Sequence, residues 1–360
     1  MSLGSDIPAR LDRLPWSGWH LRVVIALGIA WVLDGLEVTI VGSLGSALER
    51  PDTLGLSASQ VGWTASLYVA GAVLGALVFG RMADALGRKR LFMLTLMVYM
   101  AATVATAFTS SFAAFAFCRF LTGIGIGGEY AAINSAIDEL IPARVRGRVN
   151  LAINGSFWLG AALGAALSLV LLDARVLGPE YGWRAAFLMG ALLGVAVLLV
   201  RRHVPESPRW LLTHGRAEES KRVVADIERR VYGTAPQPVP AAAGVLSAAS
   251  APSESAAPNA APRQPGGLPT ARQVMHVLLR RYPQRSAVVL SLMVSQAFFY
   301  NAIFFTYSLV LTRFYGVDAS RVGLYIFPFA AGNVLGPLLL GPLFDRIGRR
   351  VMITATYALA

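Results

Sequence analysis

Long apolar runs alternate with short polar segments along the chain. A helix that crosses about 30 Å of hydrocarbon needs about 20 mostly apolar residues. Eight runs reach that length, and a ninth begins at Val351 and meets the end of the chain. The first run contains Asp34 and Glu37, and it is too long and too acidic for a cleavable signal peptide. The eight runs are Val23–Leu44, Val61–Phe79, Leu91–Thr109, Phe112–Ile141, Leu151–Leu172, Trp183–Val200, Ser286–Leu311 and Val322–Leu343.

This pattern predicts an all-α integral membrane protein, and the composition agrees with it. Of the 360 residues, 55% are hydrophobic and only 14% are charged, whereas a soluble chain has about 25% charged residues. One cysteine and four histidines exclude a disulfide framework and favour no metal site. The sequence has no visible nucleophile–base constellation. We therefore expect neither an enzyme nor a bound cofactor.

The distribution of Lys and Arg predicts the topology. If the N-terminus is cytoplasmic, 26 of the 32 basic residues lie in cytoplasmic segments, five lie in outer loops, and Arg119 lies inside a run. This bias is the positive-inside rule. We expect a multi-pass protein of the plasma (inner) membrane with a cytoplasmic N-terminus. Although the net charge is +12, the basic residues flank membrane segments and form no aromatic-interleaved groove, so we expect no nucleic-acid partner.

The segment between the sixth and seventh runs differs from the rest of the chain. Apolar residues at helical spacing within Thr213–Val231 predict an amphipathic cytosolic helix. Residues Gly233–Thr270 then hold eight of the 19 prolines and almost no charge, which predicts a disordered linker. We therefore divide the chain into an N-terminal six-helix bundle (1–201), a cytoplasmic loop (202–284) and a partial C-terminal bundle (285–360).

The chain also matches itself at an offset of 261 residues. When Ser57–Lys89 is aligned with Asp318–Arg350, 14 of 33 positions are identical, including several glycines, an aspartate and an arginine. Two unrelated apolar helices do not place such residues in register by chance. The second run therefore corresponds to the eighth, and two parallel halves are predicted around an axis normal to the membrane.

Three motifs carry a family resemblance. Residues Gly80–Arg90 resemble the loop 2–3 signature of the major facilitator superfamily, and Gly341–Arg350 resemble its second copy. Pro205–Leu211 resembles the sugar-porter branch. Arg119–Glu129, followed by Glu139 and Arg146-Gly147-Arg148, resembles span 4 and loop 4–5 of that branch. The resemblance implies a major facilitator fold of two six-span halves, of which the C-terminal half is incomplete here.

Charges within the membrane runs indicate the coupling chemistry. At 1.5 Å per residue, Glu37 and Arg119 each lie about 10 Å from the outer end of their runs, so they share a level. The resemblance implies that spans 1, 4 and 7 line a central cavity, and that proton-coupled members pair an acid in span 1 with an arginine in span 4. We hypothesise that Glu37 accepts the proton, with Arg119 as its counter-charge. Asp34 is the alternative titrating group, and a permanent structural ion pair is the alternative role.

The resemblance also indicates residues of the substrate cavity. Span 7 places amides and hydroxyls at membrane depth, but it has one glutamine, and Tyr300 stands where sugar porters have glycine. A small organic anion, including an aromatic one, therefore fits better than a hexose. The alternative is that the span 7 residues only form hydrogen bonds between helices. The cavity candidates are Arg119, Asn154, Trp158, Gln296, Tyr300 and Asn301.

A second group of residues is expected to form a cytoplasmic gate, an ion-pair cluster that breaks when the two halves rock. The alternative is a set of interfacial charges that snorkel to the membrane surface. The glycines from Gly123 to Gly128 resemble a nucleotide loop, but they lie inside an apolar run, where close helix packing is the better interpretation. The gate candidates are Gly80, Asp84, Gly87, Arg88, Lys89, Glu129, Glu139, Arg146, Glu206, Arg209, Asp345 and Arg349.

These observations predict a monomeric secondary active transporter of a small metabolite, with protons as the coupled ion and alternating access as the mechanism. The alternative is a truncated, transport-inactive membrane protein that serves as a sensor or scaffold. Because the resemblance implies spans beyond the ninth, the sequence is either a fragment of a longer product or a frameshifted one, and we favour the fragment.

Overall fold

The computed structural model describes residues 7–173, 175–201, 205–233 and 275–359. Every regular element in these ranges is a helix, so the all-α prediction is confirmed. Most of the predicted linker, residues 234–270, lies outside the described residues. The helices are α1 (Ile7–Arg13), α2 (Gly18–Leu48), α3 (Ala58–Leu86), α4 (Arg88–Ala107), α5 (Phe112–Leu140), α6 (Ala143–Leu171), α7 (Gly178–Arg201), α8 (Pro208–Thr213), α9 (Ala217–Tyr232), η1 (Val277–Arg281), α11 (Pro283–Tyr315), η2 (Ala319–Arg321), α12 (Val322–Arg346) and α13 (Arg349–Leu359).

The long helices have the length and composition of membrane spans. Within the described residues, seven helices are long and apolar enough to cross a bilayer, namely α2 to α7 and α11. Their outer faces expose large apolar side chains such as Trp63, Leu77 and Phe117, which lipid covers in a membrane. The eighth predicted span falls on α12, whose segment Val322–Gly336 is apolar. The number of spans beyond the seventh stays a prediction.

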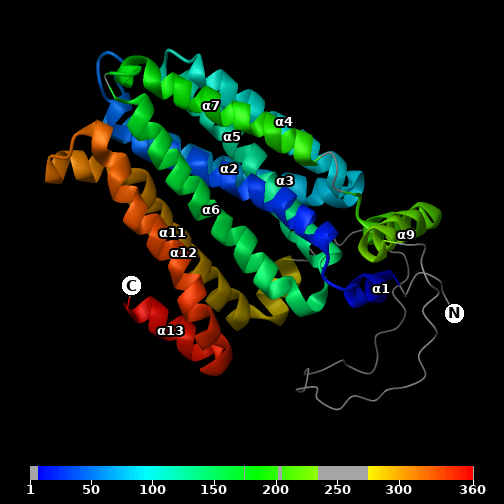
Figure 1. Cartoon of the computed structure of the whole chain (residues 1–360). Coiled ribbons are helices and arrows are strands. Elements are labelled where there is room, and N and C mark those ends of the chain that lie inside the picture. The colour runs from blue at the N-terminus through cyan, green and yellow to red at the C-terminus, as the bar shows by residue number, and fades with distance from the viewer. Residues whose placement is uncertain (1–6, 174, 202–204, 234–274, 360) are drawn as a thin grey trace, which may run out of the picture. The chain divides into compact units, whose positions relative to one another are not determined.

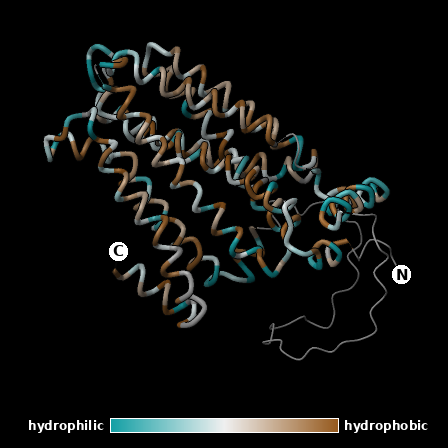
Figure 2. Tube along the Cα trace, viewed as in Figure 1, coloured by the Kyte–Doolittle hydropathy of each residue, from teal (hydrophilic) through white to brown (hydrophobic). Residues whose placement is uncertain are grey.

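The chain divides into two units. One comprises Met1–Ala235 with Ile303–Ala360, and the other comprises Pro236–Ala302. In the first unit, α2 packs on α6 and α7, α4 packs on α5 and α7, and α3 packs on α5 (Figure 1). Brown, hydrophobic residues predominate along these helices, whereas α9 is mostly teal (Figure 2). In the second unit, the described elements are η1 and the first part of α11. The three-region division predicted from the sequence stays a prediction.

Glycines bring α3 and α5 into backbone contact. A Cβ atom at Gly71 would lie 2.2 Å from the carbonyl oxygen of Phe120, and one at Gly127 would lie 1.9 Å from that of Ala72. A Cβ atom does not approach a non-bonded atom this closely, so only glycine fits these positions. The interpretation of the glycine run in α5 as a helix-packing device, rather than a nucleotide loop, is therefore confirmed.

The internal repeat extends to the backbone conformation. Gly87 separates α3 from α4 with φ of 91°, and its repeat partner Gly348 separates α12 from α13 with φ of 100°. Residues with side chains rarely adopt such a positive φ. In both matched sequences, a glycine of positive φ thus ends one helix and begins the next.

The amphipathic helix predicted within Thr213–Val231 is α9. Its apolar residues Val224 and Ile227 are buried, while most of its charged residues face outward. Thr213 itself ends the short helix α8, and Gly233 closes α9 in the left-handed conformation that favours glycine.

Candidate functional site

A buried ion pair joins α2 to α5. Arg119 Nη2 donates to Glu37 Oε1 at 2.7 Å, and each residue is only 1% exposed. Arg119 also donates to the hydroxyl of Thr122 at 2.7 Å, and Thr103 of α4 donates to Glu37 at 3.4 Å. The structure thus brings together the two residues that the depth argument paired. Their role in proton coupling stays a prediction.

Aromatic rings surround the guanidinium. The ring of Phe187 on α7 lies 4.9 Å from Arg119 Cζ, and the ring of Tyr68 on α3 lies 5.9 Å from it. These distances allow cation–π attraction, which is strongest where water is excluded. Tyr99 is fully buried and interacts electrostatically with Glu37 and with the buried Asp34. The pair therefore lies away from the protein surface, where the effective dielectric constant is low.

The ion pair is not fully satisfied. Glu37 Oε2, Arg119 Nε and Arg119 Nη1 have no hydrogen-bond partner within the described part of the chain. A buried charge that lacks partners costs free energy, and removing one member of such a pair costs about 3–5 kcal/mol. Arg119 thus retains two donor nitrogens for a further acceptor. A buried guanidinium with one ion-pair contact and two unused donors is suited to exchange one carboxylate partner for another.

The predicted cavity residues fall in different places. Arg119 is buried, whereas Asn154 is exposed and donates to the backbone oxygen of Asn150 at 2.7 Å. Trp158 is half-buried, with its ring 5.3 Å from that of Phe329 on α12. Gln296, Tyr300 and Asn301 belong to the second unit, where the amide of Asn301 donates to the Ala297 carbonyl at 2.8 Å.

An aromatic cluster that includes Trp158 lies within the first unit, and the sequence analysis did not identify the part of it formed by Trp31 and Tyr130. Phe157 contacts both Trp158 and Trp31, at ring distances of 5.3 and 6.4 Å. Trp31 stacks on Tyr130 at 4.7 Å, and the Trp31 indole N–H lacks a hydrogen-bond partner in the described residues. One signal was present in the sequence, because Trp31 precedes Asp34 by three residues and so shares its helix face.

Several gate candidates come together at the turn between α3 and α4. Arg88 forms an ion pair with Glu139 at 2.8 Å, and the hydroxyl of Ser207 donates to the same carboxylate. Glu206 accepts from the backbone N–H groups of Arg88 at 2.9 Å and Lys89 at 3.3 Å. The structure therefore joins loop 2–3, the end of α5 and the segment after α7 through charged contacts.

Other gate candidates lie elsewhere. Arg146 bonds to Asp12 and to the Ile141 carbonyl. Arg209 is exposed, and nothing lies within 4 Å of a Cβ atom placed at Gly80. Glu129 lies in α5 and is only 2% exposed. The side chains of Asp84, Asp345 and Arg349 lie outside the described residues.

Replacing Gly87 with alanine is expected to destabilise the protein by about 1–3 kcal/mol, because its backbone conformation is one that only glycine adopts readily. The new Cβ would also lie 2.6 Å from Glu206 Oε2. Thermal unfolding in detergent measures the effect. Gly147→Ala is the control, since nothing lies within 4 Å of a Cβ there. Equal unfolding temperatures for the two variants would contradict this account of the turn.

At the opposite end of the bundle, charged residues lie near the C-terminal ends of α2 and α11. Glu49 forms an ion pair with Arg313 at 2.8 Å. Ser320 donates its hydroxyl and its N–H to Asp318 at 2.7 and 2.8 Å, and these hydrogen bonds hold the pKa of the Asp318 carboxyl below its ordinary value. A carboxyl group whose pKa is lowered by folding stabilises the fold at any pH above its ordinary pKa. This contribution is lost only as the pH falls through the lowered pKa.

Comparison with known proteins identifies the family. The model of the family described as "Sugar (and other) transporter" matches residues 35–360. The chain belongs to this transporter family. The resemblance to the major facilitator superfamily is therefore confirmed, and the family is one of transporters rather than enzymes.

Two curated relatives show the range of the family. The niacin transporter NiaP of Acinetobacter baylyi is 34% identical over 62% of this chain and 49% of its own length. The 4-hydroxybenzoate transporter PcaK of the same species is 30% identical over 61% of this chain and 46% of its own length. The chain thus spans about half the length of these curated relatives.

Solved structures show the same fold. The xylose transporter XylE from Escherichia coli, in a partially occluded inward-open conformation, superposes with a TM-score of 0.67 at 16% identity. The match covers 91% of this chain and 74% of XylE. At this identity the likeness establishes the architecture and leaves the substrate open.

Proposed function

We propose that this transporter carries a small aromatic monocarboxylate across the membrane together with one proton. The single observation that carries the proposal is the buried Glu37–Arg119 pair, with its 2.7 Å contact and its unsatisfied atoms. The relatives named as niacin and 4-hydroxybenzoate transporters support the substrate class, because both compounds are aromatic carboxylates.

The coupling follows from an exchange of carboxylates. When Glu37 takes up a proton, its carboxyl becomes neutral and its attraction for the guanidinium of Arg119 falls. Arg119 is then a buried cation without a counter-charge. The carboxylate of a substrate can supply that negative charge in place of Glu37. Loss of the proton reverses the preference. Protonation and substrate binding therefore favour the same state, and each shifts the population of the other.

The aromatic part of the substrate has partners near this pair. Trp31, Phe157 and Trp158 form a connected ring cluster, and the Trp31 N–H offers a donor. Rings pack against rings in offset or edge-to-face geometry, with about 0.5–1.5 kcal/mol for each pair beyond area burial. A sugar has no such ring, and the tyrosine at position 300 departs from the sugar-porter pattern. An aromatic acid therefore fits these side chains better than a hexose.

The proposal includes an orientation. We place the N-terminus, α8 and α9 in the cytoplasm of a cell whose plasma membrane holds the protein, because most basic residues lie on that side. The charged contacts around Arg88, Glu139 and Glu206 then form the cytoplasmic gate, which must open and close in alternating access. We propose that the monomer is the working unit.

Uptake into proteoliposomes tests the function. Niacin and 4-hydroxybenzoate are expected to accumulate when the outside is acidic, and xylose is not. Because one anion and one proton carry no net charge, a potassium diffusion potential alone should drive no accumulation. Uptake that ignores the pH gradient would contradict the coupling, and uptake of xylose in place of the acids would contradict the substrate class.

A further inference from the structure

Two helices at the gate begin without a cap of their own. The residue before α4 is Gly87 and the residue before α6 is Pro142, and neither provides a side-chain hydrogen bond to its helix. The first N–H groups of a helix have no partner within the helix and need an outside acceptor. For α4 that acceptor is Glu206, as described above. For α6 it is Asp12 of α1, which accepts from the N–H of Ala143 at 3.1 Å.

Asp12 also holds the other side of the same turn. Its Oδ1 atom accepts from Arg146 Nη2 at 3.0 Å. Arg146 in turn donates to the Ile141 carbonyl from Nε at 3.2 Å and from Nη2 at 3.0 Å. Ile141 is the C-cap residue of α5. One carboxylate therefore fixes the start of α6 directly and the end of α5 through Arg146. The end of α5 at Ile141 lies two residues after the gate carboxylate Glu139.

Helix α1 is itself firmly anchored. Arg10 makes a two-pronged contact with Glu228 of α9, through Nε at 3.0 Å and Nη2 at 2.7 Å. Ile7, Leu11 and Leu14 are 2%, 6% and 2% exposed. Bidentate charge-assisted contacts of this kind fix geometry as well as adding attraction. The segment 7–14 is thus packed against its neighbours on both an apolar and a charged side.

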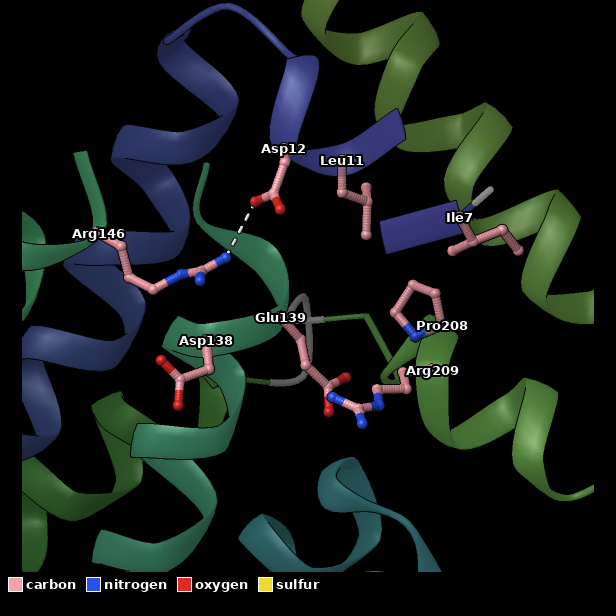
Figure 3. A pocket seen from close by; sticks show the side chains of 8 residues that line it. All are labelled: Ile7, Leu11, Asp12, Asp138, Glu139, Arg146, Pro208 and Arg209. Atoms are coloured by element: carbon pink, nitrogen blue, oxygen red, sulfur yellow. Dashed lines mark hydrogen bonds and ion pairs between the residues drawn. The ribbon is translucent and has the colours of Figure 1, made fainter. Parts of the chain in front are cut away.

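Helix α1 and the gate line a common cavity of about 200 Å³ (Figure 3). In this view the dashed contact joins Asp12 to Arg146, and Glu139 projects from α5 on the same side of the cavity as Arg209. Its lining residues are Ile7, Leu11, Asp12, Asp138, Glu139, Arg146, Pro208 and Arg209.

We propose that α1 is a positioning element of the cytoplasmic gate, in which Asp12 acts as a remote cap for α6 and Arg10 ties α1 to α9. Asp12 then does for α6 what Glu206 does for α4. The turn it fixes sets the direction of Glu139 toward Arg88. The structural part of this inference is independent of the substrate, and only its consequence for transport rests on the proposed function.

Hydrogen exchange of the full chain in detergent tests the structural part. Asp12→Ala is expected to speed amide exchange in residues 139–146 on the order of tenfold, because the turn opens more often. Asp12→Asn should restore most of the protection, since asparagine caps helices as well as aspartate does. The control is Arg13→Gln on the same helix, because Arg13 is exposed and has no ion pair among the described residues. Unchanged exchange in the alanine variant would overturn the proposal.

A charge exchange tests the anchor. The single variants Arg10→Glu and Glu228→Arg are each expected to speed amide hydrogen exchange in residues 217–232. The double variant is expected to restore the protection.

In proteoliposomes, Asp12→Ala should lower the maximal rate of niacin uptake with KM unchanged, because the gate and not the binding site is altered. Loss of protection with a normal uptake rate would overturn the gate role alone. A wild-type protein that moves no substrate would contradict the proposed function and leave the exchange result standing.

Discussion

Replacing Glu37 with glutamine is expected to abolish uptake of niacin driven by a pH gradient, while exchange of labelled for unlabelled niacin across the membrane continues. Glutamine has the shape of a protonated glutamate but cannot release a proton. The variant therefore holds the state that accepts substrate and cannot complete a cycle in which proton and substrate move together. Uptake and counterflow in the same proteoliposome preparation measure the two activities.

Asp34→Asn is the matched control, because Asp34 lies one helical turn away on the same face and is equally buried. It is expected to keep its response to the pH gradient. Unchanged pH dependence in Glu37→Gln would contradict the role of Glu37, and loss of that dependence in Asp34→Asn alone would assign the proton to Asp34.

Replacing Gly71 with alanine is expected to destabilise the fold by about 1–3 kcal/mol or more, as overpacking of a tight interface does. The added Cβ would lie 2.2 Å from the carbonyl oxygen of Phe120. That atom belongs to a helix backbone and cannot move aside alone, so α3 and α5 must separate. Thermal unfolding and the yield of monodisperse protein in detergent measure the effect.

Gly62→Ala on the same helix provides the control. Nothing lies within 4 Å of a Cβ at that position, and alanine is favoured over glycine inside a helix by about 1 kcal/mol. The control is therefore expected to be neutral or slightly stabilising. If both variants unfold at the wild-type temperature, close backbone packing of α3 on α5 does not stabilise this bundle.

The positions of the long helices could be predicted because membrane spans need continuous apolar length. The predicted run Val23–Leu44 lies inside α2, which extends from Gly18 to Leu48. Hydropathy measures the apolar stretch and not the ends of the helix, because polar residues at the membrane surface continue the helical hydrogen bonding. The sequence therefore underestimates the helix at both ends.

The Glu37–Arg119 contact could also be predicted, since few charges lie within the runs and helical rise fixes their depth. The part played by Asp12 could not. A carboxylate that caps a helix far away in the sequence leaves no local motif, and α1 has only seven residues. Arg146 was expected in the gate from the resemblance, but which acid it contacts depends on the packing of α1, which no sequence period reveals.

Proton movement recorded during substrate entry tests the role of Glu37 most directly. Proteoliposomes containing a trapped pH dye, with no initial gradient, receive niacin from outside under conditions where passive leak of the free acid is subtracted with empty vesicles. The wild-type protein is expected to acidify the lumen by one proton for each niacin that enters, and Glu37→Gln is expected to give no acidification. Equal acidification by the two proteins would contradict the account.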